Sequence, residues 1–114
     1  MLGSMPNKKL TLKWTPFALS CLDQIHDYIA FREKSDAPAF KFVNEIFERV
    51  DQLIDFPESG QAEPLLAEIG RDSRYLVIAS YKIIYEYLPV QDTVIITDIF
   101  HTSQYPEKVK RSSK

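Results

Sequence analysis

The chain has few of the residues from which disulfides and metal sites are built: of its 114 residues, one is cysteine and two are histidine. A single cysteine, Cys21, cannot form an internal disulfide, and no cysteine–histidine cluster suggests a zinc site. The sequence also has no glycine-rich phosphate loop and no nucleophile elbow. We therefore expect no metal and no cofactor, and we interpret Cys21 as a small buried hydrophobe on a helix.

Long apolar runs are also missing. No segment approaches the ~20 apolar residues that cross a bilayer, and the N-terminus lacks the apolar block of a secretory signal. These absences favour a cytoplasmic protein with no membrane partner. Residues 1–7 are expected to be a disordered lead-in or a vector-derived remnant, with Met5 as an alternative start.

Charge is distributed unevenly along the chain, although the net charge is only −2. Acidic residues dominate from residue 36 to residue 70, whereas four of the seven residues from Lys108 to Lys114 are basic and none is acidic. We interpret residues 110–114 as a solvated basic tail, with contact to phosphates or to an acidic partner as the alternative. The small net charge argues against a strongly basic nucleic-acid binder.

The first half of the chain has the pattern of one strand followed by two helices. Residues 8–14 alternate between apolar and polar, as a half-exposed strand does. Thr15-Pro16 and Ser35-Asp36 are helix-start signals, and Phe56-Pro57 with Ser59-Gly60 ends the second helix. The side chains predicted to face inward are Leu19, Leu22, Ile25 and Ile29 in the first helix, and Phe40, Val43, Ile46, Phe47, Val50, Leu53 and Ile54 in the second.

The second half predicts an antiparallel meander of three strands. These are residues 74–78, 81–88 and 93–100, separated by Ala79-Ser80 and by a turn at residues 89–92. Strands this close can pair only antiparallel, because a parallel pair needs a long crossover. We expect an α+β fold of two layers, with a helical hairpin on one face of the sheet. The N-terminal strand joins this sheet with its pairing left open, and residues 59–72 form a connector in which a short strand at 64–68 is one option.

Candidate functional residues gather in the meander. Arg71 and Arg74 lie at the start of its first strand, Lys82 near the start of the second, and His101 after the third. Basic side chains that share one sheet face could hold phosphates or carboxylates, and a histidine at a strand end suits recognition or proton transfer. The structural alternatives are protection of a sheet edge for Lys82 and capping of the strand for His101.

Three tyrosines alternate with other residues along the second meander strand. Tyr81, Tyr85 and Tyr87 share a face with Ile83, which is typical of a core or an interface rather than of a platform for stacking bases. The other histidine, His26, has acidic neighbours on the first helix and is interpreted as a solvated residue at the flank of that helix.

In order and spacing, these elements resemble the RelE/ParE superfamily of type II toxin–antitoxin toxins, which includes toxins of plasmid stabilisation systems. The resemblance covers residues from about 8 to 109, which we take as a single domain. It implies the same α+β fold and a small bacterial toxin that inhibits growth until a cognate antitoxin wraps its surface. The matching features are the strand ending at Trp14, the two helices, Phe56-Pro57, Gly60, Gly70-Arg71, the segments 74–77 and 81–85, Ile99-Phe100-His101 and Pro106.

The resemblance implies two competing activities. RelE-like members cleave mRNA on the ribosome, and in that scheme Arg74 and Lys82 would supply cations while His101 or Tyr105 would donate the proton. ParE-like members inhibit DNA gyrase and are not enzymes. No further basic residue follows Arg74 in its strand and no arginine follows His101, which favours the ParE-like activity. Gln61 departs from the family pattern, in which a basic residue commonly follows the glycine.

A third alternative is a toxin fold that has lost its toxicity and acts as an antitoxin-binding or regulatory module. The expected partners are an antitoxin and DNA gyrase, or the ribosome and mRNA under the RelE-like reading, and a homodimer is one alternative for the oligomeric state. We expect Arg74→Ala to weaken toxicity without unfolding the domain. The residues predicted to contact a target or partner are Arg71, Arg74, Tyr81, Tyr85, His101 and Tyr105.

Overall fold

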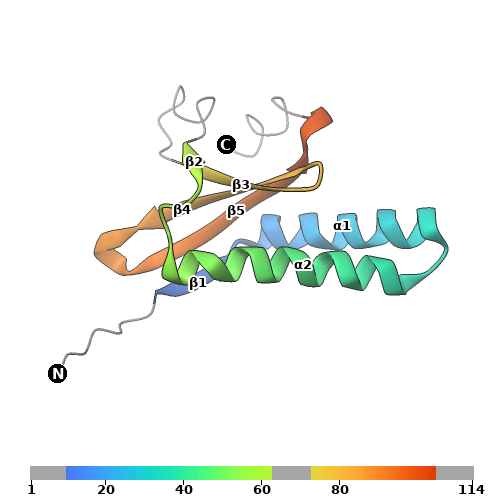
Figure 1. The fold of residues 1–114 in the computed structure, drawn as a ribbon, viewed down its shortest axis with the longest axis horizontal. Coiled ribbons are helices and arrows are strands. Elements are labelled where there is room, and N and C mark those ends of the chain that lie inside the picture. Colours follow the sequence, from blue (N-terminus) through green and yellow to red (C-terminus); the bar gives the residue numbers. More distant parts are fainter. Residues whose placement is uncertain (1–9, 63–72, 105–114) are drawn as a thin grey trace.

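The structure, a computed structural model, describes residues 10–62 and 73–104 and confirms the two-layer α+β arrangement (Figure 1). The expected strand at residues 64–68, Arg71 and Tyr105 lie outside the described residues. The elements in chain order are β1 (Thr11–Trp14), α1 (Pro16–Glu33), α2 (Asp36–Asp55), β2 (Gln61–Ala62), β3 (Arg74–Ile78), β4 (Tyr81–Leu88), the 3-10 helix η1 (Pro89–Gln91), β5 (Thr93–His101) and the 3-10 helix η2 (Thr102–Gln104).

The sheet has the strand order β1-β5-β4-β3-β2. Strands β3, β4 and β5 form the predicted antiparallel meander, and β2 pairs antiparallel with β3. Strand β1 pairs parallel with β5, and this places Thr11 opposite Thr93. A parallel pair requires a long connection, and the chain between β1 and β5 contains α1, α2 and the strands β2, β3 and β4. Helices α1 and α2 cover one face of the sheet (Figure 1).

Hydroxyl caps position both helices, as the sequence predicted. Thr15 Oγ1 accepts a hydrogen bond from Ala18 N at 3.1 Å and donates one to Thr97 O at 3.2 Å. The first bond caps α1, and the second attaches its start to β5. Ser35 Oγ accepts from Ala37 N at 3.3 Å and caps α2. Between the helices, Lys34 adopts a left-handed conformation with φ 55°, which closes the hairpin within a short link.

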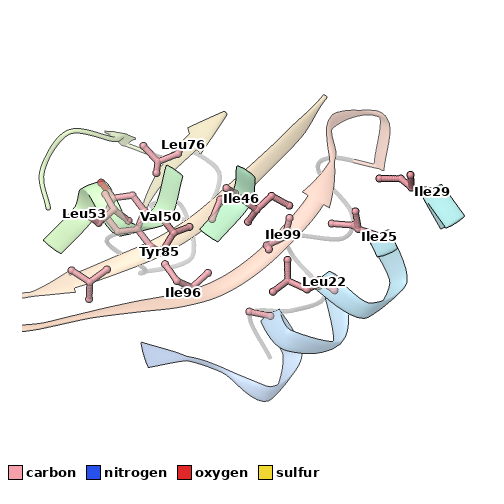
Figure 2. Packing of buried hydrophobic residues seen from close by; sticks show 14 of the residues in the cluster. Leu22, Ile25, Ile29, Ile46, Val50, Leu53, Leu76, Tyr85, Ile96 and Ile99 are labelled. Carbon is pink, nitrogen blue, oxygen red and sulfur yellow. The ribbon is translucent and has the colours of Figure 1, made fainter. Parts of the chain in front are cut away.

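The core lies between the hairpin and the sheet (Figure 2). Helix α1 contributes Ile25 and Ile29, and α2 contributes Ile46, Val50 and Leu53. The sheet contributes side chains from each meander strand, and Cys21 is buried beside them as predicted. The sheet residues labelled in Figure 2 are Leu76, Tyr85, Ile96 and Ile99.

Three of the apolar helix residues that were predicted to face inward are instead exposed, so the prediction is wrong for them. Leu19 is 46% exposed, Phe40 58% and Phe47 39%. The sheet contacts only one side of the hairpin, and that side is occupied by other residues, including Ala18, Cys21 and Ala39, which are nearly inaccessible. Because an apolar stripe in a helix can be wider than the face that the sheet covers, its remaining members lie on the outer side of the hairpin.

Candidate functional site

The two faces of the meander have different environments. Side chains alternate along a strand, and in β4 Tyr81, Ile83 and Tyr85 face the helices and pack in or against the main core. Ile84, on the opposite face, forms a small separate cluster with Phe100 and Tyr75. Any site built on the meander must therefore be assigned to one of these two faces.

Arg74 lies on the helix-facing side, opposite Tyr85 in the β3–β4 ladder. Its guanidinium donates hydrogen bonds to Glu58 O at 3.2 Å and to Gly60 O at 3.1 Å. These two carbonyls belong to the segment that leads from α2 into β2. The contacts give Arg74 a structural task, which is to hold this segment against the start of β3.

Lys82 lies on the other face of the sheet, opposite Val77 on one side and Phe100 on the other. Its Nζ is 4.1 Å from the centroid of the Tyr75 ring, which is a cation–π contact. The structure therefore separates Arg74 from Lys82 by the thickness of the sheet. The two cations do not meet at one site.

Tyr85 is fully buried and satisfied by hydrogen bonds. Its hydroxyl accepts from Gly60 N at 2.9 Å and donates to Pro57 O at 2.9 Å. Burial raises the pKa of this hydroxyl, and the Gly60 amide and the charge of Arg74 oppose that rise. Tyr85, which the sequence analysis predicts to bind a partner, is thus part of the main core between the sheet and the helices.

Tyr81 and His101 are brought together at the far end of the sheet. They face each other in the β4–β5 ladder, and their rings form an edge-to-face pair with centroids 5.2 Å apart. The His101 Nδ1 accepts a hydrogen bond from the backbone amide of Ser103 at 3.1 Å, with Ser103 Oγ at 2.8 Å. Because a backbone amide can only donate, Nδ1 carries no proton in this arrangement, and Nε2 is the protonated nitrogen.

Residues near this pair were missed by the sequence reasoning. Arg32 lies near Tyr28 on α1, with its guanidinium carbon 5.3 Å from the centroid of that ring. Burial, followed by the neighbouring Tyr28, raises the pKa of Tyr81, and the Arg32 charge opposes the rise. The i, i+4 spacing of Tyr28 and Arg32 is a signal that could have revealed their contact.

A second candidate surface is a groove on the outer side of the hairpin. It has a volume of about 500 Å³ and runs between α1 and α2. The Nε2 atom of His26 is buried there and has no hydrogen-bond partner among the described residues, while the His26 ring lies 4.7 Å from that of Phe40. The groove is lined by Leu19, Leu22, Asp23, His26, Phe40, Val43 and Phe47.

Within residues 10–62 and 73–104, no group of three or more His, Cys, Asp or Glu side chains is placed to hold a metal ion. In the same ranges, no helix combines the length and apolar character needed to cross a membrane.

Comparison with known proteins agrees with this fold. A family profile described as the ParE toxin of the type II toxin–antitoxin system, parDE, matches residues 12–106. A search among curated protein sequences finds no match.

Solved structures that are similar to the chain include the following three. A chromosomal ParDE toxin–antitoxin system from P. aeruginosa has a TM-score of 0.66 at 24% identity, covering 81% of this chain and 95% of that one. The free state of a mutant E. coli toxin RelE has a TM-score of 0.59 at 14% identity, with coverages of 91% and 98%. The toxin–antitoxin complex RelBE2 from Mycobacterium tuberculosis has a TM-score of 0.57 at 16% identity, with coverages of 82% and 99%. At these identities the likeness concerns the fold.

The profile match extends over most of the chain, and the strand order, the helical hairpin and the meander fit it. The chain belongs to the ParE toxin family of type II toxin–antitoxin systems.

Proposed function

We propose that this toxin acts on DNA gyrase without being an enzyme and that a cognate antitoxin neutralises it. The family match is to ParE rather than to RelE toxins, and this supports the ParE-like activity. The observation that carries the proposal is the placement of Arg74 and Lys82 on opposite faces of the sheet.

A ribonuclease that uses the 2′-hydroxyl as nucleophile needs cations beside the scissile phosphate and an acid for the leaving oxygen. Arg74 donates to the carbonyls of Glu58 and Gly60, and Lys82 lies over the ring of Tyr75. Among the described residues, these two side chains do not form a common phosphate site. Their separation argues for a binding toxin rather than a catalytic one.

The runner-up is a RelE-like, ribosome-dependent endoribonuclease. One observation favours it: His101 is only partly buried and stands beside the Tyr81 ring, so that an acid–base group lies at the edge of the sheet. A third alternative, a non-toxic relic that still binds antitoxin, would keep the fold and the outer groove but would not inhibit growth.

The partner we propose for the outer groove is an amphipathic helix of the antitoxin. Leu19, Phe40 and Phe47 expose apolar surface along two adjacent helices. A helix that lays its apolar face into a groove buries such surface on both partners. The P. aeruginosa and M. tuberculosis structures are toxin–antitoxin systems of the same fold, which supports an antitoxin as the occupant.

The target is tested with purified protein and DNA gyrase in a supercoiling assay, scored for trapped linear DNA. Trapped cleavage complexes that disappear on addition of the antitoxin are the expected result. If the protein arrests growth but traps no DNA, and mRNA is cut on the ribosome, the RelE-like alternative is correct. If induced expression leaves growth unchanged, the chain is the non-toxic relic.

The groove is tested with a matched pair of substitutions. Phe40→Ser removes an aromatic ring from the groove, whereas Phe31→Ser removes one that is 84% exposed and is not among the groove residues. We expect Phe40→Ser to weaken antitoxin binding by at least about tenfold, in line with the loss of a buried aromatic anchor. Phe31→Ser should bind the antitoxin with the same affinity as the unsubstituted chain. Equal affinities for the two variants would exclude the groove as the antitoxin site.

A further inference from the structure

The helical hairpin projects past the turn between β3 and β4, which leaves a corner between the tips of the helices and the end of the sheet (Figure 1). Two hollows meet in this corner, and Tyr81 lines both of them. Their volumes are about 190 Å³ and about 330 Å³. Neither shares a described lining residue with the outer groove, so the corner is a separate surface.

Four of the side chains that line the smaller hollow carry hydrogen-bond donors, and the other lining residues are Cys21, Ile25, Ile99 and Phe100. The Gln24 amide, the hydroxyls of Tyr28 and Tyr81, and the His101 ring belong to side chains that line it. Ser103 fixes the His101 tautomer by donating its amide hydrogen to Nδ1, so Nε2–H is a donor as well. None of the described residues that line this hollow is an aspartate or a glutamate.

Arg32 and Glu33 line the adjoining larger hollow rather than this one. Arg32 lies over the Tyr28 ring, and its charge acts on the Tyr81 hydroxyl. Its Nε donates to Glu33 Oε2 at 2.9 Å, so the two side chains form an ion pair. Several neutral donors with no described acidic side chain among them suit an oxyanion, because hydrogen bonds to a charged acceptor are the stronger ones.

The larger hollow has apolar walls. Ile29, Pro38 and Phe42 line it together with Tyr81, and the rings of Phe42 and Tyr81 have centroids 5.7 Å apart. The charged residues that line it balance in sign: Arg32 and Lys41 are basic, and Glu33 and Glu45 are acidic. This hollow suits an apolar side chain.

We propose that the corner binds a protein segment in which an aspartate or glutamate stands next to an apolar residue. The carboxylate occupies the smaller hollow, and the apolar side chain occupies the larger one on the other side of Tyr81. The inference goes beyond the proposed function, since it assigns a ligand chemistry to a second surface and holds whether or not gyrase is the target.

A nucleic-acid strand fits the corner less well. Binding of a phosphate backbone requires several cations in series. Here Glu33 and Glu45 accompany Arg32 and Lys41 in the larger hollow, so a polyanion would meet as many negative charges as positive ones. A single carboxylate in the smaller hollow avoids that repulsion.

The test is a titration of the full-length isotope-labelled toxin, followed by NMR, with a blocked phenylalanyl-glutamate dipeptide. The matched ligand is the blocked phenylalanyl-glutamine dipeptide, which has the same shape without the charge. The glutamate peptide should shift signals of Tyr81 and His101 with a Kd on the order of 1 mM, and the glutamine peptide should bind at least about tenfold more weakly.

Protein variants complete the test. Tyr81→Phe keeps the ring and removes the hydroxyl, and we expect it to weaken binding of the glutamate peptide by roughly fivefold. Tyr75→Phe is the control, because its hydroxyl bonds to Gln61 on the other face of the sheet. Equal binding of the two peptides, no saturable shift at Tyr81, or shifts only with a single-stranded oligonucleotide would each overturn the proposal. Because the titration measures binding, it is independent of whether the toxin arrests growth.

Discussion

The Tyr85 hydroxyl and the Gly60 amide form a buried hydrogen bond of 2.9 Å that joins the middle of the sheet to the segment after α2. The bond depends on the missing side chain at Gly60. A Cβ there would lie 2.5 Å from the Tyr85 hydroxyl oxygen and 2.7 Å from the Tyr75 carbonyl oxygen. The glycine and the tyrosine are therefore fitted to each other, and each limits what the other position can hold.

Tyr85→Phe should destabilise the fold. The substitution leaves the Gly60 amide and the Pro57 carbonyl without their partner while keeping the ring in the core. We expect a loss of about 1–3 kcal/mol in the free energy of unfolding, measured by urea denaturation. Tyr87→Phe is the control at a partly buried tyrosine on the same strand, and it should change stability by less than about 0.5 kcal/mol. Equal losses for the two variants would contradict this assignment.

Gly60→Ala should also be destabilising, for a steric reason. The added methyl group would contact both the Tyr85 hydroxyl and the backbone of β3, and backbone cannot rotate away as a flexible side chain can. Overpacking of this kind costs about 1–3 kcal/mol. Combining it with Tyr85→Phe should cost less than the sum of the single losses, because one of the three close contacts, that with the hydroxyl oxygen, is removed. A strictly additive double mutant would show that the two positions are independent.

The buried Tyr85 predicts a loss of stability at alkaline pH. Burial raises the pKa of Tyr85 in the folded chain, whereas an unfolded tyrosine titrates near pH 10. The folded chain therefore binds its proton more tightly, so the stabilisation is complete below about pH 10 and is lost as pH rises through the folded value. Tyr81 shifts in the same direction. The urea concentration at the unfolding midpoint should fall as pH rises above about 10, and it should fall less steeply in Tyr85→Phe. If the midpoint depends on pH equally in both proteins, Tyr85 does not cause the alkaline loss of stability.

The sequence predicted the elements well because the local signals agreed. Thr15-Pro16 and Ser35-Asp36 start the helices where expected, and Ala79-Ser80 is the turn between β3 and β4. The pairing of β1 was left open and is parallel to β5. Such a pairing joins distant parts of the chain, and no local pattern encodes it.

The site was less predictable, because it depends on which face a side chain occupies. Arg74 and Lys82 are near each other in sequence, but the register of β3 and β4 puts them on opposite faces. Leu19 and Phe40 fit an inward stripe, yet both are exposed on the side of the hairpin that the sheet does not cover. His101 and Tyr81 became neighbours only through the pairing of β4 with β5.

Two alanine substitutions in the meander distinguish residues that stabilise the fold from residues that are needed for activity. Arg74→Ala should lower stability by about 1–3 kcal/mol, since the carbonyls of Glu58 and Gly60 lose their donor. Lys82→Ala removes a cation–π contact and should cost less than about 1 kcal/mol. For a gyrase-directed toxin, we expect Lys82→Ala to keep its activity in the supercoiling assay. A loss of growth arrest in Lys82→Ala at unchanged stability would instead support a catalytic role.

The parallel pairing of β1 with β5 also determines when this protein can finish folding during synthesis. The hydrogen bond from Thr15 to Thr97 joins residues 82 positions apart. Strand β1 leaves the ribosome early but has no partner in the sheet until β5 has also emerged. Contacts over such separations form late. The complete sheet therefore forms only after nearly the whole described chain has been made.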